Sequence, residues 1–100
     1  MKYGYVNKFT TKSGKREELM TVLLKAAKVL ETNSDCLQYL ISTAGEPETL
    51  YVTEIWASKQ AHDASLEPPG VKTVIAQAMP FIASVSNIAE LQIEGGKGLN

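Results

Sequence analysis

The segment TEIWASKQAH, residues 53–62, holds three side chains whose chemistry could serve a reaction. Trp56 is the only tryptophan of the chain and His62 is its only histidine, and Glu54 lies two residues before the tryptophan. Histidine is the side chain that most readily takes up or releases a proton near neutral pH. The segment is typical of a strand that ends at the tryptophan and turns into a helix, so the three side chains could meet at one strand end.

Asn7 is a fourth candidate, because its amide interrupts a strand face that otherwise carries Tyr3, Tyr5 and Phe9. A buried amide must be hydrogen-bonded, and a pocket gives it a reason to be there. Each candidate also has a purely structural interpretation. Trp56 could serve packing alone, and His62, followed by Asp63, could be a solvated surface residue.

Glu54 shares a strand face with Trp56 and is costly to bury as a lone charge. An ion pair with a Lys or Arg, including one across a subunit interface, is the expected structural role for it. A wet cavity that the carboxylate lines is the alternative.

Composition and charge restrict the possible partners. The 100 residues make one domain, and 44% hydrophobic and 21% charged residues are typical of a globular protein. A formal charge of −1 with no basic stripe argues against nucleic acid. No secretory leader is evident, and no apolar run approaches the roughly 20 residues of a membrane span. We therefore expect a cytoplasmic location and no membrane partner.

No cofactor or metal is expected. The single Cys36 cannot form an intrachain disulfide, and one histidine leaves no Cys/His metal spacing, although a site made of carboxylates alone stays open. No glycine-rich phosphate loop and no Ser-His-Asp or Cys-His signature is evident.

The alternation of side chains along KYGYVNKFTT predicts a first strand at residues 2–11. Apolar residues at three- and four-residue spacing predict a helix that starts after an N-cap at Ser13 or Gly14 and runs to about Thr32. If Gly14 is the cap, Glu17 falls at N3. Asn33 is expected to end this helix in the left-handed conformation.

A hairpin and a broken helix follow. The strand at residues 36–43 should place Leu37, Tyr39 and Ile41 on one face, and AGEPET turns into a strand at residues 50–57. Ser58 should cap a short helix that EPPG interrupts, because proline cannot donate a backbone hydrogen bond. The helix that resumes after this break should carry an apolar stripe. NIAELQIE at residues 87–94 is expected to form the last strand. The domain should then span residues 1–94, and residues 95–100 should form a loose tail.

The order β-α-β-β-α-β is the ferredoxin-like α+β arrangement, with a four-stranded antiparallel sheet and both helices on one face. In this topology the first and third strands are central neighbours, which should place Asn7 close to Trp56, with His62 above them in a pocket between sheet and helices. The opposite face carries Val6, Leu40, Tyr51 and Ile55, which is too apolar to face water. A second subunit should cover it.

The chain resembles the antibiotic biosynthesis monooxygenase (ABM) superfamily of dimeric α+β barrels. The resemblance covers residues 1 to about 94 and rests on TKSGKREEL, on the pattern Glu54-x-Trp56-x-Ser58-x-x-Ala61 and on the element order. The superfamily includes quinol monooxygenases, small heme-degrading enzymes and an isomerase-like branch, so its scaffold hosts several chemistries.

Residue comparison separates these branches. Heme-degrading members use an Asn on the first strand, a Trp at the end of the third and an axial His in the second helix. Asn7 and Trp56 match, but the axial position falls near Val74 or Ile75, neither of which can ligate iron. Other branches often carry His at positions that are Ser65 and Gly70 here.

The resemblance implies a cofactor-independent monooxygenase that acts as a homodimer on an electron-rich aromatic, such as a quinol or a polyketide-like compound, with O₂ as co-substrate. The alternatives are a small-ligand binding protein or an isomerase on the same fold, with heme degradation third. Asn7 and Trp56 would position a ring oxygen, and His62 would take the proton. The expected substrate-binding residues are Tyr5, Phe9, Glu54, Ser65, Val74 and Met79.

Overall fold

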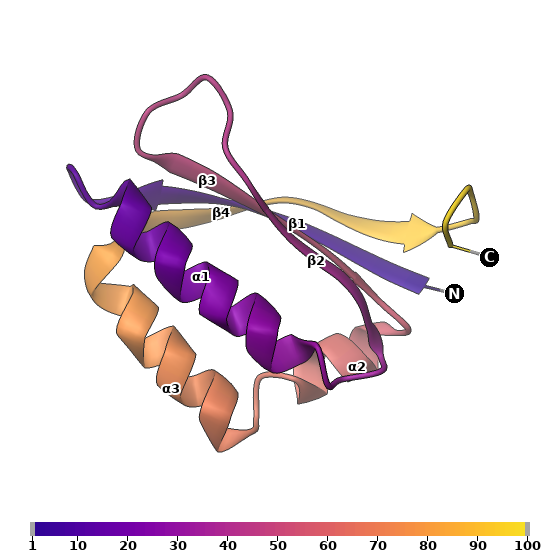
Figure 1. The fold of residues 1–100 in the computed structure, drawn as a ribbon. Helices are drawn as coiled ribbons and strands as arrows, with labels where there is room; N and C mark the ends of the chain where they lie inside the picture. Colours follow the sequence, from indigo (N-terminus) through magenta and orange to yellow (C-terminus); the bar gives the residue numbers. More distant parts are fainter. Residues whose placement is uncertain (1, 100) are drawn as a thin grey trace.

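The structure is a computed structural model, which describes residues 2–99. Strands β1 (Lys2–Thr11) and β3 (Thr49–Trp56) lie at the centre of a four-stranded antiparallel sheet. Strand β2 (Cys36–Ser42) pairs with β3 at one edge, and β4 (Ile82–Ile93) pairs with β1 at the other (Figure 1). The strand order β2-β3-β1-β4 confirms the predicted ferredoxin-like α+β fold.

The helices cover one face of the sheet. Helices α1 (Arg16–Leu30) and α3 (Pro69–Ala78) pack against each other below the sheet, and the short α2 (Lys59–Ala64) lies near the end of β3 (Figure 1). A single 3₁₀ turn, η1 (Met79–Phe81), joins α3 to β4. The largest buried cluster joins sheet and helices through Leu19, Val22, Leu23, Leu50, Val52 and Ala78. None of the helices within residues 2–99 is long and apolar enough to cross a membrane.

Strand β3 follows the predicted alternation. Leu50, Val52, Glu54 and Trp56 face the helices and are buried, whereas the residues between them are half-buried on the other face. A two-residue period places alternate side chains on opposite faces, so this strand could be assigned from its pattern alone.

Strand β2 departs from its predicted alternation. The pairing with β3 is irregular between Cys36 and Gln38, so that Cys36 lies opposite Trp56 and packs against it, while Leu37 remains 39% exposed. A bulge inserts one unpaired residue and shifts the faces that follow. The prediction that Leu37 shares a face with Tyr39 and Ile41 is therefore wrong.

Helix α1 begins later and ends earlier than predicted. Its N-cap is Lys15 rather than Ser13 or Gly14, which puts Glu17 at N2, still in the first turn where the helix dipole favours a carboxylate. Its last residue is Leu30.

Asn33 is not in the left-handed conformation, since the only described residue other than glycine with a positive φ is Glu48. Instead the side-chain oxygen of Asn33 accepts a hydrogen bond from the backbone N–H of Asp35 at 3.0 Å, which closes a turn.

The helix break occurs as predicted. The Ser58 hydroxyl caps α2 by accepting from the N–H of Ala61 at 3.0 Å, and α3 starts at Pro69. Strand β4, however, starts at Ile82 rather than Asn87, because its first residues pair with the far end of β1, where Thr11 lies opposite Ile82.

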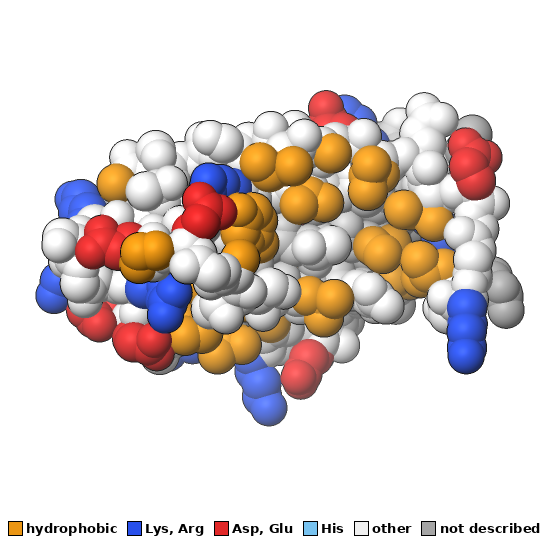
Figure 2. All heavy atoms as spheres, turned by 90° about the horizontal axis from the view of Figure 1, so that it is seen from above, with side chains coloured by type: hydrophobic (Ala, Val, Ile, Leu, Met, Phe, Trp, Pro, Cys, Tyr) orange, Lys and Arg blue, Asp and Glu red, His pale blue; other side chains and the backbone are white. Residues whose placement is uncertain are grey.

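The sheet face that carries no helices is partly apolar. Figure 2 looks onto this side and shows hydrophobic side chains gathered in several patches. Leu40 is 50% exposed and Leu91 is 43% exposed, and Val6, Tyr51 and Ile55 are half-buried. Gly4 lets β4 approach closely here, because a Cβ at this position would lie 3.0 Å from the Cβ of Leu91. We refer to this surface as the open face.

Candidate functional site

A cavity of about 340 Å³ lies between the sheet and the helices. Its walls are mostly apolar and come from α1, α3 and the start of β4, and its polar side chains come from β1, β2, β3 and α2. This volume is at the lower end of the range for small-molecule sites, about 300–1,000 Å³. Of the residues that the sequence suggested for the site, Trp56 alone does not line this cavity. The residues that do line it are Tyr5, Asn7, Phe9, Glu54, His62, Ser65, Val74 and Met79.

His62 is a buried residue of the cavity wall, with 8% of its surface exposed. Its Nδ1 lies 3.0 Å from Oδ1 of Asp63, and its Nε2 lies 3.9 Å from Oε1 of Glu54. The ring centroid is 4.8 Å from that of Tyr5 and 5.7 Å from that of Trp56. The interpretation of His62 as a solvated surface residue is therefore wrong.

The Asp63 carboxylate can only accept a hydrogen bond, so it favours the ring form that carries a proton on Nδ1. In that form the Nε2 of His62 is an acceptor, and it is the nitrogen on the Glu54 side. With this tautomer, the site presents a proton acceptor beside an apolar cavity.

Trp56 does not line the cavity. Its side chain is fully buried, and its indole N–H donates a hydrogen bond of 3.0 Å to Oε1 of Glu54. The tryptophan therefore holds the carboxylate in place from behind the cavity wall.

Glu54 has no Lys or Arg within ion-pair distance among the residues described, so the predicted ion pair is absent from this subunit. Burial raises the pKa of Glu54, while the hydrogen bond from Trp56 and the proximity of His62 act in the opposite direction. The carboxylate thus faces the cavity, as the alternative interpretation expected.

Asn7 lies further from Trp56 than predicted. On β1 it sits opposite Val52, whereas the residue opposite Trp56 is Tyr3. Its side-chain oxygen accepts a hydrogen bond of 3.0 Å from the amide of Asn87 on β4. Asn7 and His62 therefore line separate parts of one cavity wall, with Tyr5 between Asn7 and the strand end.

The positions where related branches carry other residues can also be located. Ser65 lines the cavity, and its hydroxyl donates to the backbone carbonyl of His62, which fixes the last turn of α2. Val74 and Ile75 line the cavity from α3 and carry no atom that could ligate iron.

Three residues at the site, Asp63, Asn87 and Tyr39, are not among the site residues predicted from the sequence. Asp63 follows His62 directly, which was a usable signal, whereas the contact of Asn87 with Asn7 depends on a strand pairing that the sequence does not reveal. Tyr39 lines the cavity from β2, and burial together with the nearby Glu54 raises its pKa. Its hydroxyl therefore stays protonated and can donate a hydrogen bond.

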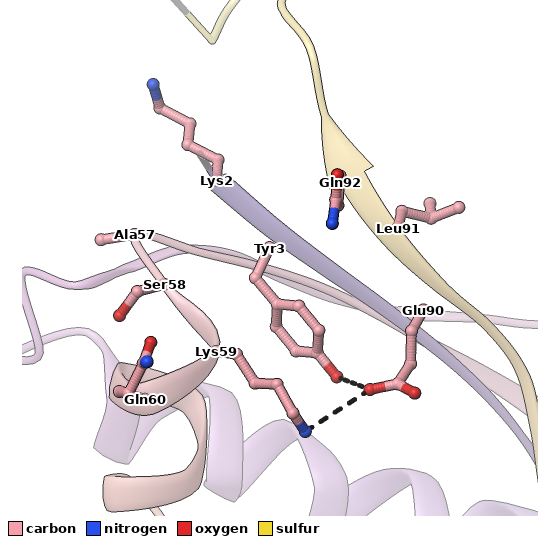
Figure 3. A pocket seen from close by; sticks show the side chains of 9 residues that line it. All are labelled: Lys2, Tyr3, Ala57, Ser58, Lys59, Gln60, Glu90, Leu91 and Gln92. Atoms are coloured by element: carbon pink, nitrogen blue, oxygen red, sulfur yellow. Dashed lines mark hydrogen bonds and ion pairs between the residues drawn. The ribbon is translucent and has the colours of Figure 1, made fainter.

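A second hollow lies outside this cavity, where β4 passes the start of α2 (Figure 3). The Tyr3 hydroxyl donates to Oε1 of Glu90 at 2.6 Å, and the Lys59 ammonium lies 3.6 Å from the same oxygen. Lys59 also lies 3.9 Å from Asp63. The hollow is wider than the cavity, at about 540 Å³, and more open to solvent, and its central charged groups already pair with one another.

Comparisons with known proteins agree with this architecture. A crystal structure of a candidate antibiotic biosynthesis monooxygenase from Chloroflexus aurantiacus J-10-fl is 30% identical, with a TM-score of 0.89 and full coverage of both chains. A candidate antibiotic biosynthesis monooxygenase from Caulobacter crescentus CB15 is 26% identical, with a TM-score of 0.83 over 93% of this chain and 91% of that one.

SnoaB from Streptomyces nogalater, a cofactor-independent oxygenase, shares the fold at a TM-score of 0.79 over 96% of both chains, with 12% identity. No curated protein matches the sequence. Residues 3–77 match the family profile described as antibiotic biosynthesis monooxygenase, which is most of the chain. The chain therefore belongs to the antibiotic biosynthesis monooxygenase family.

Proposed function

We propose that the protein is a cofactor-independent monooxygenase that oxidises a small, electron-rich hydroxyaromatic molecule with O₂ in the cavity between sheet and helices. One observation carries the proposal: His62 lies buried in the wall of an apolar cavity, with a carboxylate facing each of its ring nitrogens. Such a ring can accept a proton from a bound hydroxyl group.

The proton transfer is the first step. With the Nδ1 proton held by Asp63, the Nε2 of His62 accepts the proton of the substrate hydroxyl. The two carboxylates offset the positive charge that the ring gains. The substrate anion stays next to this charge in a largely apolar space, where the attraction is screened less than in water.

The oxidation follows from the substrate's own electrons. The anion reduces O₂ and combines with it at a ring carbon that carries one hydrogen, while the ionised oxygen of the substrate becomes a carbonyl. The peroxide formed in this way takes back the proton that His62 had accepted. Breakage of the O–O bond with loss of the hydrogen on the ring carbon leaves a carbonyl at that carbon and releases water. One oxygen atom enters the product, the other leaves as water, and the substrate supplies all four electrons.

The other residues have positioning or binding roles. Asn7, held by Asn87, would orient a second oxygen of the substrate, and Tyr5 would stack against the ring. Phe9, Val74 and Met79 would supply apolar contact. We assign Trp56 a positioning role through Glu54 rather than a contact with the substrate.

Membership of the family and the fold shared with SnoaB support this proposal. An isomerase is the second candidate, because Glu54 and His62 are two proton-transfer groups on one wall, which could move a proton between two substrate positions. Heme degradation ranks below both, because the position expected to supply the axial ligand is held by Val74 and Ile75.

We further propose that two subunits pack through the open face, which would form the dimeric barrel. The exposed Leu40 and Leu91 and the hydrophobic patches of Figure 2 support this arrangement. Neither residue lines the cavity, so the dimer would leave the site geometry within each subunit.

The test measures oxygen uptake and product mass with purified, metal-stripped protein and a panel of naphthoquinols, anthrones and catechols. We expect a product that has gained one oxygen atom, and a large loss of rate in His62→Ala. Gln60→Ala, on the exposed side of the same helix, is the matched control. Uptake that is unchanged in both His62→Ala and Asn7→Ala would remove the proposed site, and exchange of substrate hydrogen with solvent deuterium without uptake would favour the isomerase.

A further inference from the structure

We propose that the cavity selects uncharged hydroxyaromatic molecules and rejects those that carry an additional carboxylate, and that Glu54 sets this selectivity. The proposal deepens the proposed function, on which it rests for the class of ligand. It concerns binding alone, so it can be tested without turnover.

The charges around the cavity are the first argument. Among the described residues that line it, Glu54 is the one carboxylate, His62 is the one group that can become positive, and none is Lys or Arg. Lys59 is the basic side chain near His62, but it lies against Asp63 and Glu90 on the outer side. A carboxylate in the cavity would therefore lose its hydration and find no Lys or Arg to pair with, and His62 already lies between two carboxylates.

The charge balance of the reaction is the second argument. Transfer of a proton from a neutral hydroxyaromatic to His62 creates one positive and one negative charge, so the net charge of the site does not change. The imidazolium then lies beside the new anion, Glu54 and Asp63. A second ionised group on the ligand would add a negative charge that nothing in the cavity offsets.

The rigidity of Glu54 is the third argument. The indole N–H of Trp56 holds its carboxylate at 3.0 Å, and the side chain is only 11% exposed. Glu54 therefore cannot turn into solvent to make room for another anion. Its position in β3, between two buried residues of the same face, restricts it further.

Isothermal titration calorimetry under anaerobic conditions tests the proposal with three ligands of one ring system: a naphthol, the corresponding hydroxynaphthoate and its methyl ester. The ester matches the acid in size and lacks its charge. Glu54→Gln removes the cavity charge while its amide can still accept from Trp56. Glu17→Gln, exposed in the first turn of α1, removes the same charge outside the cavity and serves as the control.

We expect the naphthol and the ester to bind at least about tenfold more tightly than the acid, because desolvating an unpaired carboxylate is costly. In Glu54→Gln this ratio should fall several-fold, and in Glu17→Gln it should stay as in the original protein. Equal or tighter binding of the acid, or an unchanged ratio in Glu54→Gln, would overturn the proposal.

The result can be separated from that of the proposed function. Charge-selective binding without oxygen uptake from any panel substrate would uphold the selectivity and refute the oxygenase. Oxygen uptake with carboxylated and uncharged substrates at equal affinity would do the reverse.

Discussion

The hydrogen bond from Trp56 to Glu54 predicts a specific energetic link between the two side chains. Replacing Trp56 by Phe removes the donor, which lies 3.0 Å from the Glu54 carboxylate in a fully buried position. A hydrogen bond to a charged group is worth about 1.5–3 kcal/mol, whereas one to a neutral amide is worth about 0.5–1.5 kcal/mol. Trp56→Phe should therefore cost about 1 kcal/mol more in the original protein than in a Glu54→Gln background.

The assay is thermal or urea unfolding followed by circular dichroism, because the variant lacks the tryptophan needed for fluorescence. For a domain of this size, 1 kcal/mol corresponds to a shift of about 4–8 °C in Tm. All four proteins of the double-mutant cycle must be compared at one concentration, since association adds to apparent stability. An equal cost of Trp56→Phe in both backgrounds would refute the idea that the indole supports the carboxylate.

The same bond links stability to activity. If Trp56 positions Glu54 without touching substrate, Trp56→Phe should lower turnover although the cavity keeps its lining. A tryptophan that bound substrate directly would instead mainly raise KM.

Three further outcomes are expected. Asp63→Asn should lower kcat about 5–30-fold with little change in KM. This corresponds to a loss of about 1–2 kcal/mol of transition-state stabilisation, a modest value because the Asp63 side chain is 59% exposed and partly neutralised by Lys59. Asp63→Glu should restore part of the rate. Glu54→Gln should stabilise the protein at neutral pH, because burial raises the pKa of Glu54 and the folded state carries its charge at a cost. This gain should begin to fade as pH falls through the raised pKa, and it should be lost below the ordinary pKa of glutamate, where the carboxyl is protonated in both the folded and the unfolded state. Leu40→Lys, on the open face, should convert a dimer into monomers in light scattering.

Each of these expectations has a contrary result. Equal losses of kcat and rises of KM in Asp63→Asn would indicate a general disturbance of α2. A gain in Glu54→Gln that grows toward acid pH would mean that the carboxylate is better stabilised in the folded state than in the unfolded chain. A dimer that survives Leu40→Lys would move the interface to another surface.

Much of the fold could be predicted because its signals are local. The alternation from Leu50 to Trp56 in β3, the Ser58 cap and the break at Pro68 each follow from neighbouring residues, and the structure confirms them. The element order then limits the topology, since a split βαβ unit has few alternatives.

The errors lie where pairing between distant segments decides the local structure. The bulge at Leu37 depends on the register against β3, and the early start of β4 depends on the far end of β1. Neither leaves a pattern in its own segment.

The candidate site also combines features that the sequence predicts with features that depend on contacts between distant segments. The convergence of Glu54 and His62 on one cavity follows from the topology, but the place of Trp56 behind the wall depends on how far each side chain reaches. The contact of Asp63 with His62 is not predicted by the sequence, because an acidic residue next to a histidine on a short helix is also common at a surface. Distances between side chains, which the sequence does not contain, separate these cases.

The single tryptophan also makes the protein its own optical reporter. Trp56 is shielded from water, donates to a carboxylate of the cavity and meets the His62 ring edge-on. A molecule that enters the cavity would change the field at the indole without touching it, so emission intensity and wavelength should respond to binding at this one place. Candidate ligands that do not absorb at the excitation wavelength could therefore be screened by fluorescence without any label.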